Sequence, residues 1–273
     1  MRIVAYDERE HHQTGIPSTG GVRLHVVRSG AGDPVTVFAA GLGGTIPETR
    51  TLGSGVAGTR VFFDFRGHGA SGVPEDGDWS YDAIVEDLRA VADAAGATRA
   101  VGMSMGAAAI LGILAGDPER FERCVLFLPA IIDRPRADIA TRRLGEVARR
   151  IEEGDLDAVV ELLAAELPRE LRDSPGVATY LRDRAAQLSG PGVAGLLRAL
   201  ATTRPVPDRV ALSGVPARCL VVGQEGDDTH PAQIARELAA ALPNARLHVF
   251  DSPGGLFTHR RALRELVTPF LND

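Results

Sequence analysis

Residues 102–106 read Gly-Met-Ser-Met-Gly, and this stretch decides how the rest of the chain is interpreted. It follows an apolar run at Thr98–Val101 and precedes an Ala-, Ile- and Leu-rich run at Ala107–Ala115. That is the strand, sharp turn and helix context of a nucleophile elbow, in which the turn lifts a serine hydroxyl clear of the backbone. Glycines two residues to either side let the strand and the helix pack closely. Ser104 is therefore the candidate nucleophile.

Composition narrows the classes of function. With 273 residues, 44% hydrophobic and 24% charged, the chain has room for one large α/β domain, or for a core that carries an insertion. The net charge of −6 gives no reason to expect a nucleic-acid partner. The sequence contains no lysine, which excludes Schiff-base chemistry and a phosphate-loop lysine.

The cysteines and the start of the chain bear on location. Cys124 and Cys219 both lie in apolar, strand-like runs, so we expect buried thiols, a cytoplasmic location and no metal site. The opening Met-Arg-Ile-Val-Ala-Tyr-Asp-Glu is too acidic for a secretory leader, and no apolar run approaches membrane-spanning length. We expect a small-molecule substrate, neither a membrane nor a nucleic acid as partner, and an oligomeric state that the sequence leaves open, a homodimer included.

Strand and helix patterns alternate along most of the chain. Helical periodicity follows Ser80, at Ala232–Ala241 and at Arg260–Leu271. This alternation predicts an α/β fold with a mostly parallel central sheet and helices on both faces. The expected strands are Gly21–Arg28, Val35–Ala39, Arg60–Phe65, Thr98–Val101, Cys124–Leu128, Ala217–Val222 and Arg246–Phe250.

The pattern changes between Asp133 and Val215. Four helical runs separated by prolines occupy this segment, and no strand pattern is present. We therefore expect a core formed by residues 1–132 and 216–273 and a helical cap formed by residues 133–215. The helical runs are Arg142–Ile151, Leu156–Leu167, Val177–Leu188 and Val193–Ala201.

Two further motifs extend the elbow into a family resemblance. The glycine-rich Gly41-Leu42-Gly43-Gly44 follows the strand Val35–Ala39, and the segment 64–71 reads Asp-Phe-Arg-Gly-His-Gly-Ala-Ser. Together with the elbow, these stretches resemble the α/β-hydrolase family over nearly the whole chain. The resemblance implies that Ser104 is the nucleophile. It also implies that two backbone N–H groups bind the oxyanion: that of Met105, next to Ser104, and that of Leu42, on the loop that includes Gly41 and Gly43. It also implies that His68 is a structural residue of a tight loop.

The resemblance places the catalytic acid after the strand Ala217–Val222. Relatives often carry an aspartate three residues before a His-Pro pair, which points to Asp227 in the stretch Gly226-Asp227-Asp228-Thr229-His230-Pro231. Asp228 is the alternative, because loop registers shift easily. We interpret His230 as a packing residue at a helix entry, since Pro231 favours the first turn of a helix.

The general base is expected after the last strand. Relatives place this histidine directly after a glycine there, where this chain has Gly255 or Leu256, and His259 follows a few residues later. His259 keeps the order Ser, Asp, His of this fold, so we assign it as the base. His248 is read as a packing residue on the last strand, and His11, His12 and His25 lie in the N-terminal segment, remote from the triad loops.

These assignments predict a cofactor-free serine hydrolase that acts on an ester-like or other acyl bond of a small, largely apolar substrate. The fold alone does not choose the reaction. The displaced histidine keeps open a non-hydrolytic enzyme, such as a lyase, a cyclase or a cofactor-free oxygenase. A non-catalytic ligand-binding protein is the third alternative, and a strained elbow argues against it.

Overall fold

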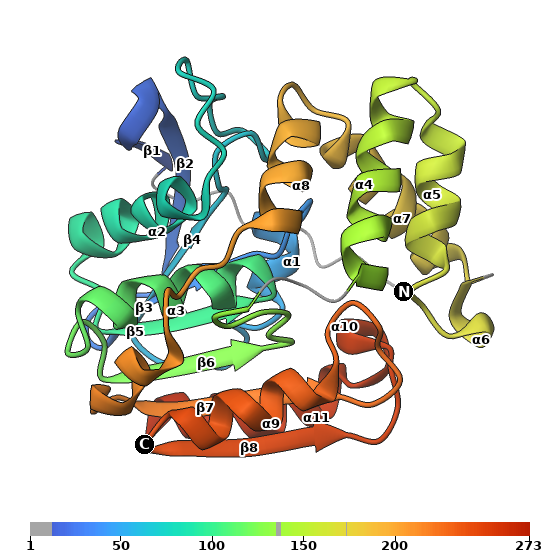
Figure 1. Ribbon diagram of the computed structural model, residues 1–273. Coiled ribbons are helices and arrows are strands. Elements are labelled where there is room, and N and C mark those ends of the chain that lie inside the picture. Colours follow the sequence, from blue (N-terminus) through green and yellow to red (C-terminus); the bar gives the residue numbers. More distant parts are fainter. Residues whose placement is uncertain (1–12, 135–137, 173) are drawn as a thin grey trace.

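The computed structural model describes residues 13–134, 138–172 and 174–273. Within them, eight strands form one sheet in the order β1-β2-β4-β3-β5-β6-β7-β8 (Figure 1). β2 pairs antiparallel with both β1 and β4, and every other neighbouring pair is parallel. The predicted fold class is confirmed. The strands are β1 (Gln13–Pro17), β2 (Arg23–Ser29), β3 (Val35–Ala39), β4 (Thr59–Phe63), β5 (Arg99–Met103), β6 (Arg123–Phe127), β7 (Arg218–Gln224) and β8 (Ala245–Phe250).

The helices fall into two groups. Those outside the stretch between β6 and β7 are α1 (Ile46–Arg50), α2 (Tyr81–Ala95), α3 (Met105–Gly116), α9 (Ala232–Ala241), α10 (Gly255–Thr258) and α11 (Arg260–Asn272). Those between β6 and β7 are α4 (Asp138–Glu152), α5 (Leu156–Ala164), α6 (Arg169–Arg172), α7 (Pro175–Leu188) and α8 (Val193–Thr202). We call residues 138–202 the helical insertion. Two short 3-10 turns, Thr19–Gly21 and Arg209–Gly214, complete the described elements.

The central strands bury both of their faces. Along β5, Ala100 packs with the cluster that holds α2 and α3, while the next residue, Val101, packs with the cluster that holds α11. β6 repeats this alternation at Cys124 and Val125. A strand covered on both faces reads as a continuous apolar run, which is why these segments lack a polar face in the sequence. Cys124 and Cys219 are buried free thiols on neighbouring strands.

The helical insertion has its own small core. Its buried side chains come from α4, α5, α7 and α8, for example Val147, Val159, Leu181 and Leu197. Among the residues described between β6 and β7, none belongs to a strand. In Figure 1 the arrows of β6, β7 and β8 point toward the side of α10 and the helical insertion, so the carboxyl ends of these strands lie on that side. The helical content is as predicted, and the separate cap domain at 133–215 stays a prediction.

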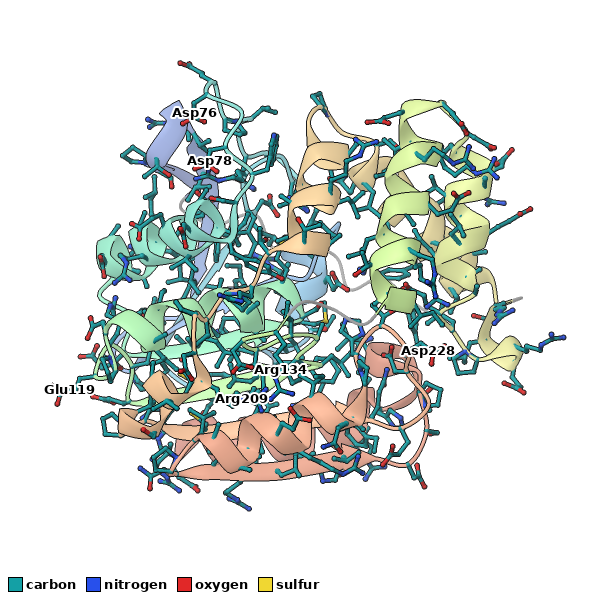
Figure 2. The ribbon with its side chains drawn as sticks, viewed as in Figure 1. Asp76, Asp78, Glu119, Arg134, Arg209 and Asp228 are labelled. Atoms are coloured by element: carbon teal, nitrogen blue, oxygen red, sulfur yellow. The ribbon has the colours of Figure 1, made fainter. Side chains whose placement is uncertain are left out.

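One ion pair joins the two connections between core and insertion. Asp133, which follows β6, accepts three hydrogen bonds from the guanidinium and one from the backbone N–H of Arg209, which precedes β7 (Arg209 is labelled in Figure 2). The side-chain hydrogen bonds from Arg209 are the main reason why the pKa of Asp133 falls to about 2. None of the described helices is long and apolar enough to cross a bilayer.

Candidate active site

The elbow places Ser104 between β5 and α3 in a strained conformation. Its φ of 49° and ψ of −104° lie outside the regions that a serine ordinarily occupies. The flanking glycines make this turn possible. A Cβ at Gly102 would lie 2.5 Å from the backbone of Gly106, and a Cβ at Gly106 would lie 2.3 Å from the carbonyl oxygen of Ala39. Strand and helix are therefore closer here than any larger residue permits.

Ser104 lies against a histidine that the sequence analysis assigned to packing. The Nε2 atom of His230 is 2.9 Å from Ser104 Oγ, and its Nδ1 atom is 3.0 Å from Asp227 Oδ2. The carboxylate accepts from Nδ1–H, so Nε2 is left to accept the serine hydroxyl proton. The structure thus brings Ser104 and Asp227 together through His230.

The acid and the histidine share one turn after β7. Asp227 Oδ1 accepts the backbone N–H groups of Thr229 and His230, each at 2.9 Å, and this holds the carboxylate under the ring. The buried Gln224 donates to Asp227 Oδ2 at 2.6 Å. Burial opposes ionisation of Asp227. The His230 ring and these hydrogen bonds outweigh burial and hold the pKa of the Asp227 carboxyl well below its usual range.

The prediction that His259 lies beside Ser104 is wrong. Its Nε2–H donates to the carbonyl oxygen of Ser252 at 2.7 Å, and its ring stacks on Phe250 with centroids 4.1 Å apart. The loop after β8 does not fold back to deliver this side chain to Ser104. Residues Gly255–Thr258 form α10 instead, and the buried Gln224 accepts the N–H of Gly255 at 2.9 Å. His259 therefore sits at the start of α11 and holds that loop.

Chain order could not separate the two histidines, because both follow Ser104 and Asp227. The usable signal is the spacing Asp-x-x-His at 227–230. An aspartate that accepts backbone N–H groups two and three residues ahead brings the side chain of the third residue over its own carboxylate. Asp228, the alternative acid, is exposed, and His230 pairs with Asp227 instead. The His248 ring packs against Phe250, as expected. His11 and His12 lie outside the described residues.

The glycine-rich loop lies directly above Ser104. A Cβ on Gly41 would be 3.5 Å from the Cβ of Ser104. Met105 is the first residue of α3, so its N–H has no partner within the helix, and the helix N-terminus favours negative charge there. Leu42 and Met105 line the same small cavity as Ser104 and His230. The arrangement suits backbone donors facing an oxyanion next to Ser104.

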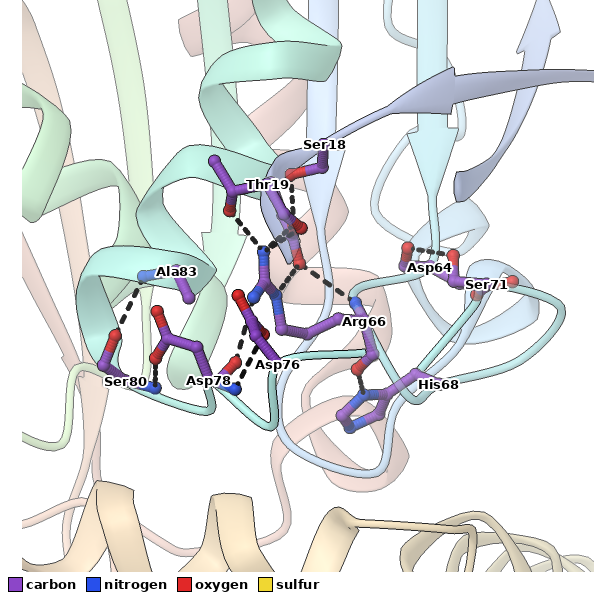
Figure 3. A network of polar contacts seen from close by, with 11 residues as sticks. Ser18, Thr19, Asp64, Arg66, His68, Ser71, Asp76, Asp78, Ser80 and Ala83 are labelled. Atoms are coloured by element: carbon purple, nitrogen blue, oxygen red, sulfur yellow. Dashed lines mark hydrogen bonds and ion pairs between the residues drawn. The ribbon is translucent and has the colours of Figure 1, made fainter. Parts of the chain in front are cut away.

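His68 fixes the shape of the glycine-rich loop. Its Nε2 atom accepts the N–H of Gly43 at 2.9 Å, and its Nδ1–H donates to the carbonyl oxygen of Arg66 at 2.8 Å (Figure 3). Gly43 therefore donates to His68 rather than to a substrate. Burial lowers the pKa of His68, although the Arg66 carbonyl and the charge of Asp64 offset part of this effect. The neutral ring links the two loops.

The loop of His68 is itself anchored in the core. Arg66 is fully buried and forms an ion pair with the buried Asp87 at 2.7 Å, and its Nη1 donates to the carbonyl oxygen of Asp78 at 3.0 Å. Ser71 Oγ donates to the carbonyl oxygen of Asp64 (Figure 3). These contacts tie the turn at 64–71 to the protein interior, which agrees with the structural role expected for His68.

Two cavities meet at Ser104. One, of about 100 Å³, is lined by strand and loop residues such as Met103, Phe127 and Leu128. The other, of about 50 Å³, lies under leucines of the helical insertion. Arg184 and Glu166 line both, which the sequence analysis did not anticipate. Among the described residues, no group of three or more His, Cys, Asp or Glu side chains is arranged to hold a metal ion.

Comparison with known proteins agrees with this geometry. A family profile described as "Alpha/beta hydrolase family" matches residues 26–267. A 2-hydroxymuconate semialdehyde hydrolase of Pseudomonas putida is 28% identical over 220 residues, which span 77% of this chain and 75% of that protein. Two solved structures have TM-scores of 0.78. An esterase from Exiguobacterium antarcticum is 19% identical and an enol-lactonase from Burkholderia xenovorans 21% identical, each match spanning 96% of this chain and 100% of the other.

Proposed function

This chain belongs to the α/β-hydrolase family, and on that premise we propose that it is a serine hydrolase that cleaves an ester or similar acyl bond of a small molecule. One observation carries the proposal: His230 Nε2 lies 2.9 Å from Ser104 Oγ while Nδ1 of the same ring is held by Asp227. A serine hydroxyl is a weak nucleophile, and a base within hydrogen-bond reach is what activates it.

The first half of the reaction forms an acyl-enzyme. Ser104 Oγ attacks the carbonyl carbon as its proton passes to His230 Nε2, and Asp227 stabilises the imidazolium that results. His230 then returns the proton to the departing alkoxide, which leaves as an alcohol. In the second half, water loses a proton to His230 and attacks the acyl carbon. The proton returns to Ser104, and the acid product leaves.

The backbone stabilises the charge that develops on the carbonyl oxygen. We assign this role to the N–H groups of Leu42 and Met105, supported by their place beside Ser104. Loss of one such donor typically costs about 3–4 kcal/mol of barrier. His68 contributes indirectly, because it fixes the loop that carries Leu42.

The helical insertion serves as the roof of the site in this proposal. Its helices α4, α5, α7 and α8 each place side chains on the cavities around Ser104, among them Leu144, Leu163, Leu188 and Leu197. These leucines support an apolar substrate, and Arg184 and Glu166 add polar contacts. The alternative of non-hydrolytic chemistry rested on a displaced histidine, and the position of His230 removes that reason.

A fluorophosphonate probe tests the proposal directly. We expect one label per folded molecule, located on Ser104 by mass spectrometry, together with turnover of short p-nitrophenyl esters. Ser104→Ala should lose both. A folded wild-type protein that stays unlabelled and inactive, or a Ser104→Ala variant that labels equally, would show that the proposal is wrong.

A further inference from the structure

A third hollow adjoins the two cavities at Ser104. It has a volume of about 860 Å³ and runs along the glycine-rich loop, α1, α7 and α10. We call it the outer groove. It shares Glu48, Arg184, Leu256 and Phe257 with the cavity of about 100 Å³, and Arg184 lines all three spaces. The outer groove therefore adjoins the site of the proposed reaction, and these shared side chains line the boundary between the two spaces.

The spaces next to Ser104 are small. The two cavities there measure about 100 and about 50 Å³. Pockets for small molecules usually measure about 300–1,000 Å³. Of the three spaces, the outer groove alone is of that size. The outer groove is therefore the one of these three spaces in which the larger part of a substrate of ordinary size would fit.

The walls of the outer groove suit an apolar or aromatic group. Phe257 is 37% exposed, and its ring meets that of Tyr180 edge to face with centroids 4.9 Å apart. Val177 and Leu256 extend this surface, and the charged Asp183 and Arg260 lie among the lining residues. A large exposed aromatic side chain inside a groove next to a reactive serine gains burial when an apolar group binds.

A polar contact marks the junction between groove and inner cavity. Tyr180 OH donates to Glu48 Oε1 at 3.1 Å and accepts from Arg184 Nη1 at 2.5 Å. Tyr180 and Arg184 belong to α7, whereas Glu48 belongs to α1. This contact holds α7 against the core and keeps one wall of the groove in place.

We propose, on the basis of the function proposed above, that the substrate is an asymmetric ester. One half is short and sits beside Ser104, and the other is a larger apolar or aromatic group that lies in the outer groove. The groove is thus the specificity subsite of the enzyme, and its walls come from both the core and α7.

Two glycines in the helical insertion provide a matched test. A Cβ on Gly176 of α7, which lines the groove, meets no atom within 4 Å, and neither does a Cβ on Gly145 of α4, which lines none of the three spaces. Gly176→Trp fills the groove, whereas Gly145→Trp adds the same side chain elsewhere. Ala186→Trp, on the same groove, is the second blocking variant.

Four esters read out the result: ethyl acetate, 4-phenylbutyl acetate, ethyl 5-phenylpentanoate, and 4-phenylbutyl 5-phenylpentanoate. We expect one of the two asymmetric esters to exceed ethyl acetate in kcat/KM by about tenfold or more, and the doubly large ester to fall below it. Gly176→Trp and Ala186→Trp should cancel that gain, mainly through KM, and so lower kcat/KM for the favoured ester far more than for ethyl acetate. Gly145→Trp should behave as wild type.

Failure of this inference is distinct from failure of the proposed function. If Ser104 labels and ethyl acetate is hydrolysed, but the large asymmetric esters gain nothing or folded blocking variants keep the gain, the groove assignment is overturned. The groove assignment is also overturned if the doubly large ester is hydrolysed as well as the favoured asymmetric ester. If no ester is hydrolysed and Ser104 does not label, both proposals fall.

Discussion

At the scale of residues, the site depends on one turn of four residues. Asp227 and His230 are three positions apart, so a single loop after β7 supplies both the carboxylate and the imidazole. Gln224 ties this loop to the one after β8, through hydrogen bonds to Asp227 and from Gly255. The position after β8 where relatives carry the base holds Gly255 or Leu256 here, and both residues line the cavity next to Ser104.

Adjacent aspartates test the assignment of the acid. Asp227→Asn should preserve the fold and lower kcat on the order of 10⁴-fold, the loss known for this change in a serine protease, because an amide favours the wrong tautomer of the histidine. Asp228→Asn is the control, since Asp228 is exposed, and it should keep full activity. Esterase kinetics on both variants decide the matter. Activity lost only in Asp228→Asn would move the role by one residue.

His68 gives a prediction about pH. Its pKa is lowered by burial in the folded protein, so below its ordinary pKa of about 6.5 the unfolded chain binds a proton that the folded chain refuses. The contribution of His68 to stability is therefore present above that pH and declines as the pH falls. His68→Gln, which keeps an acceptor for the Gly43 N–H, removes this dependence.

Chemical denaturation at pH 7.5, 6.5 and 5.5 measures it. The free energy of unfolding of wild type should drop relative to that of His68→Gln as the pH decreases, by up to about 1.4 kcal/mol per pH unit. Parallel curves for the two proteins would mean that His68 does not titrate as its burial requires.

At the scale of elements, the elbow explains why the sequence was informative around Ser104. The requirement for Gly102 is steric and local, because a Cβ there would meet the backbone of Gly106 four residues along the chain, and Gly106 in turn lies against the backbone of Ala39 in β3. Local requirements of this kind leave a readable pattern. The same holds for α2, whose N-cap Ser80 accepts the N–H of Ala83.

Glycine substitutions in α3 test this account. Gly106→Ala places a methyl group 2.3 Å from the Ala39 carbonyl oxygen, so strand and helix must separate. We expect a loss of stability of about 1–3 kcal/mol, the usual cost of overpacking, together with a loss of activity. Gly116→Ala, also in α3 and with open space around its Cβ, should be neutral or slightly stabilising. Thermal unfolding compares them, and equal melting temperatures would contradict the steric argument.

Other elements could not be read from the sequence. β1 contains Gly15 and Pro17 and pairs only with β2 at the sheet edge, so no periodicity marks it. α1, α6 and α10 are four or five residues long, too short for a helical period to register. The prediction of His259 as base failed for a related reason, because α10 redirects the chain before that residue.

At the scale of the whole molecule, the order of strands and helices predicted the fold, since each parallel strand is a continuous apolar run and each helix a periodic one. The site, in contrast, forms where several loops meet. His230, the outer groove and the Glu48–Tyr180–Arg184 contact each join segments far apart in the chain. Apart from the Asp-x-x-His spacing at 227–230, no pattern within one segment records such meetings. The sequence therefore pointed to Ser104 and Asp227 but not to the histidine between them.

The central claim is that His230, and not His259, is the base that activates Ser104. The most direct measurement is kcat of His230→Ala and His259→Ala on one short p-nitrophenyl ester, with thermal unfolding to establish that both variants are folded. We expect His230→Ala to lose at least about 10³-fold in kcat, as removal of a triad member does. His259→Ala should keep most of its activity. It should lose stability, because the hydrogen bond to Ser252 and the stacking on Phe250 are gone. A folded His230→Ala variant near wild-type activity, beside an inactive His259→Ala, would contradict it.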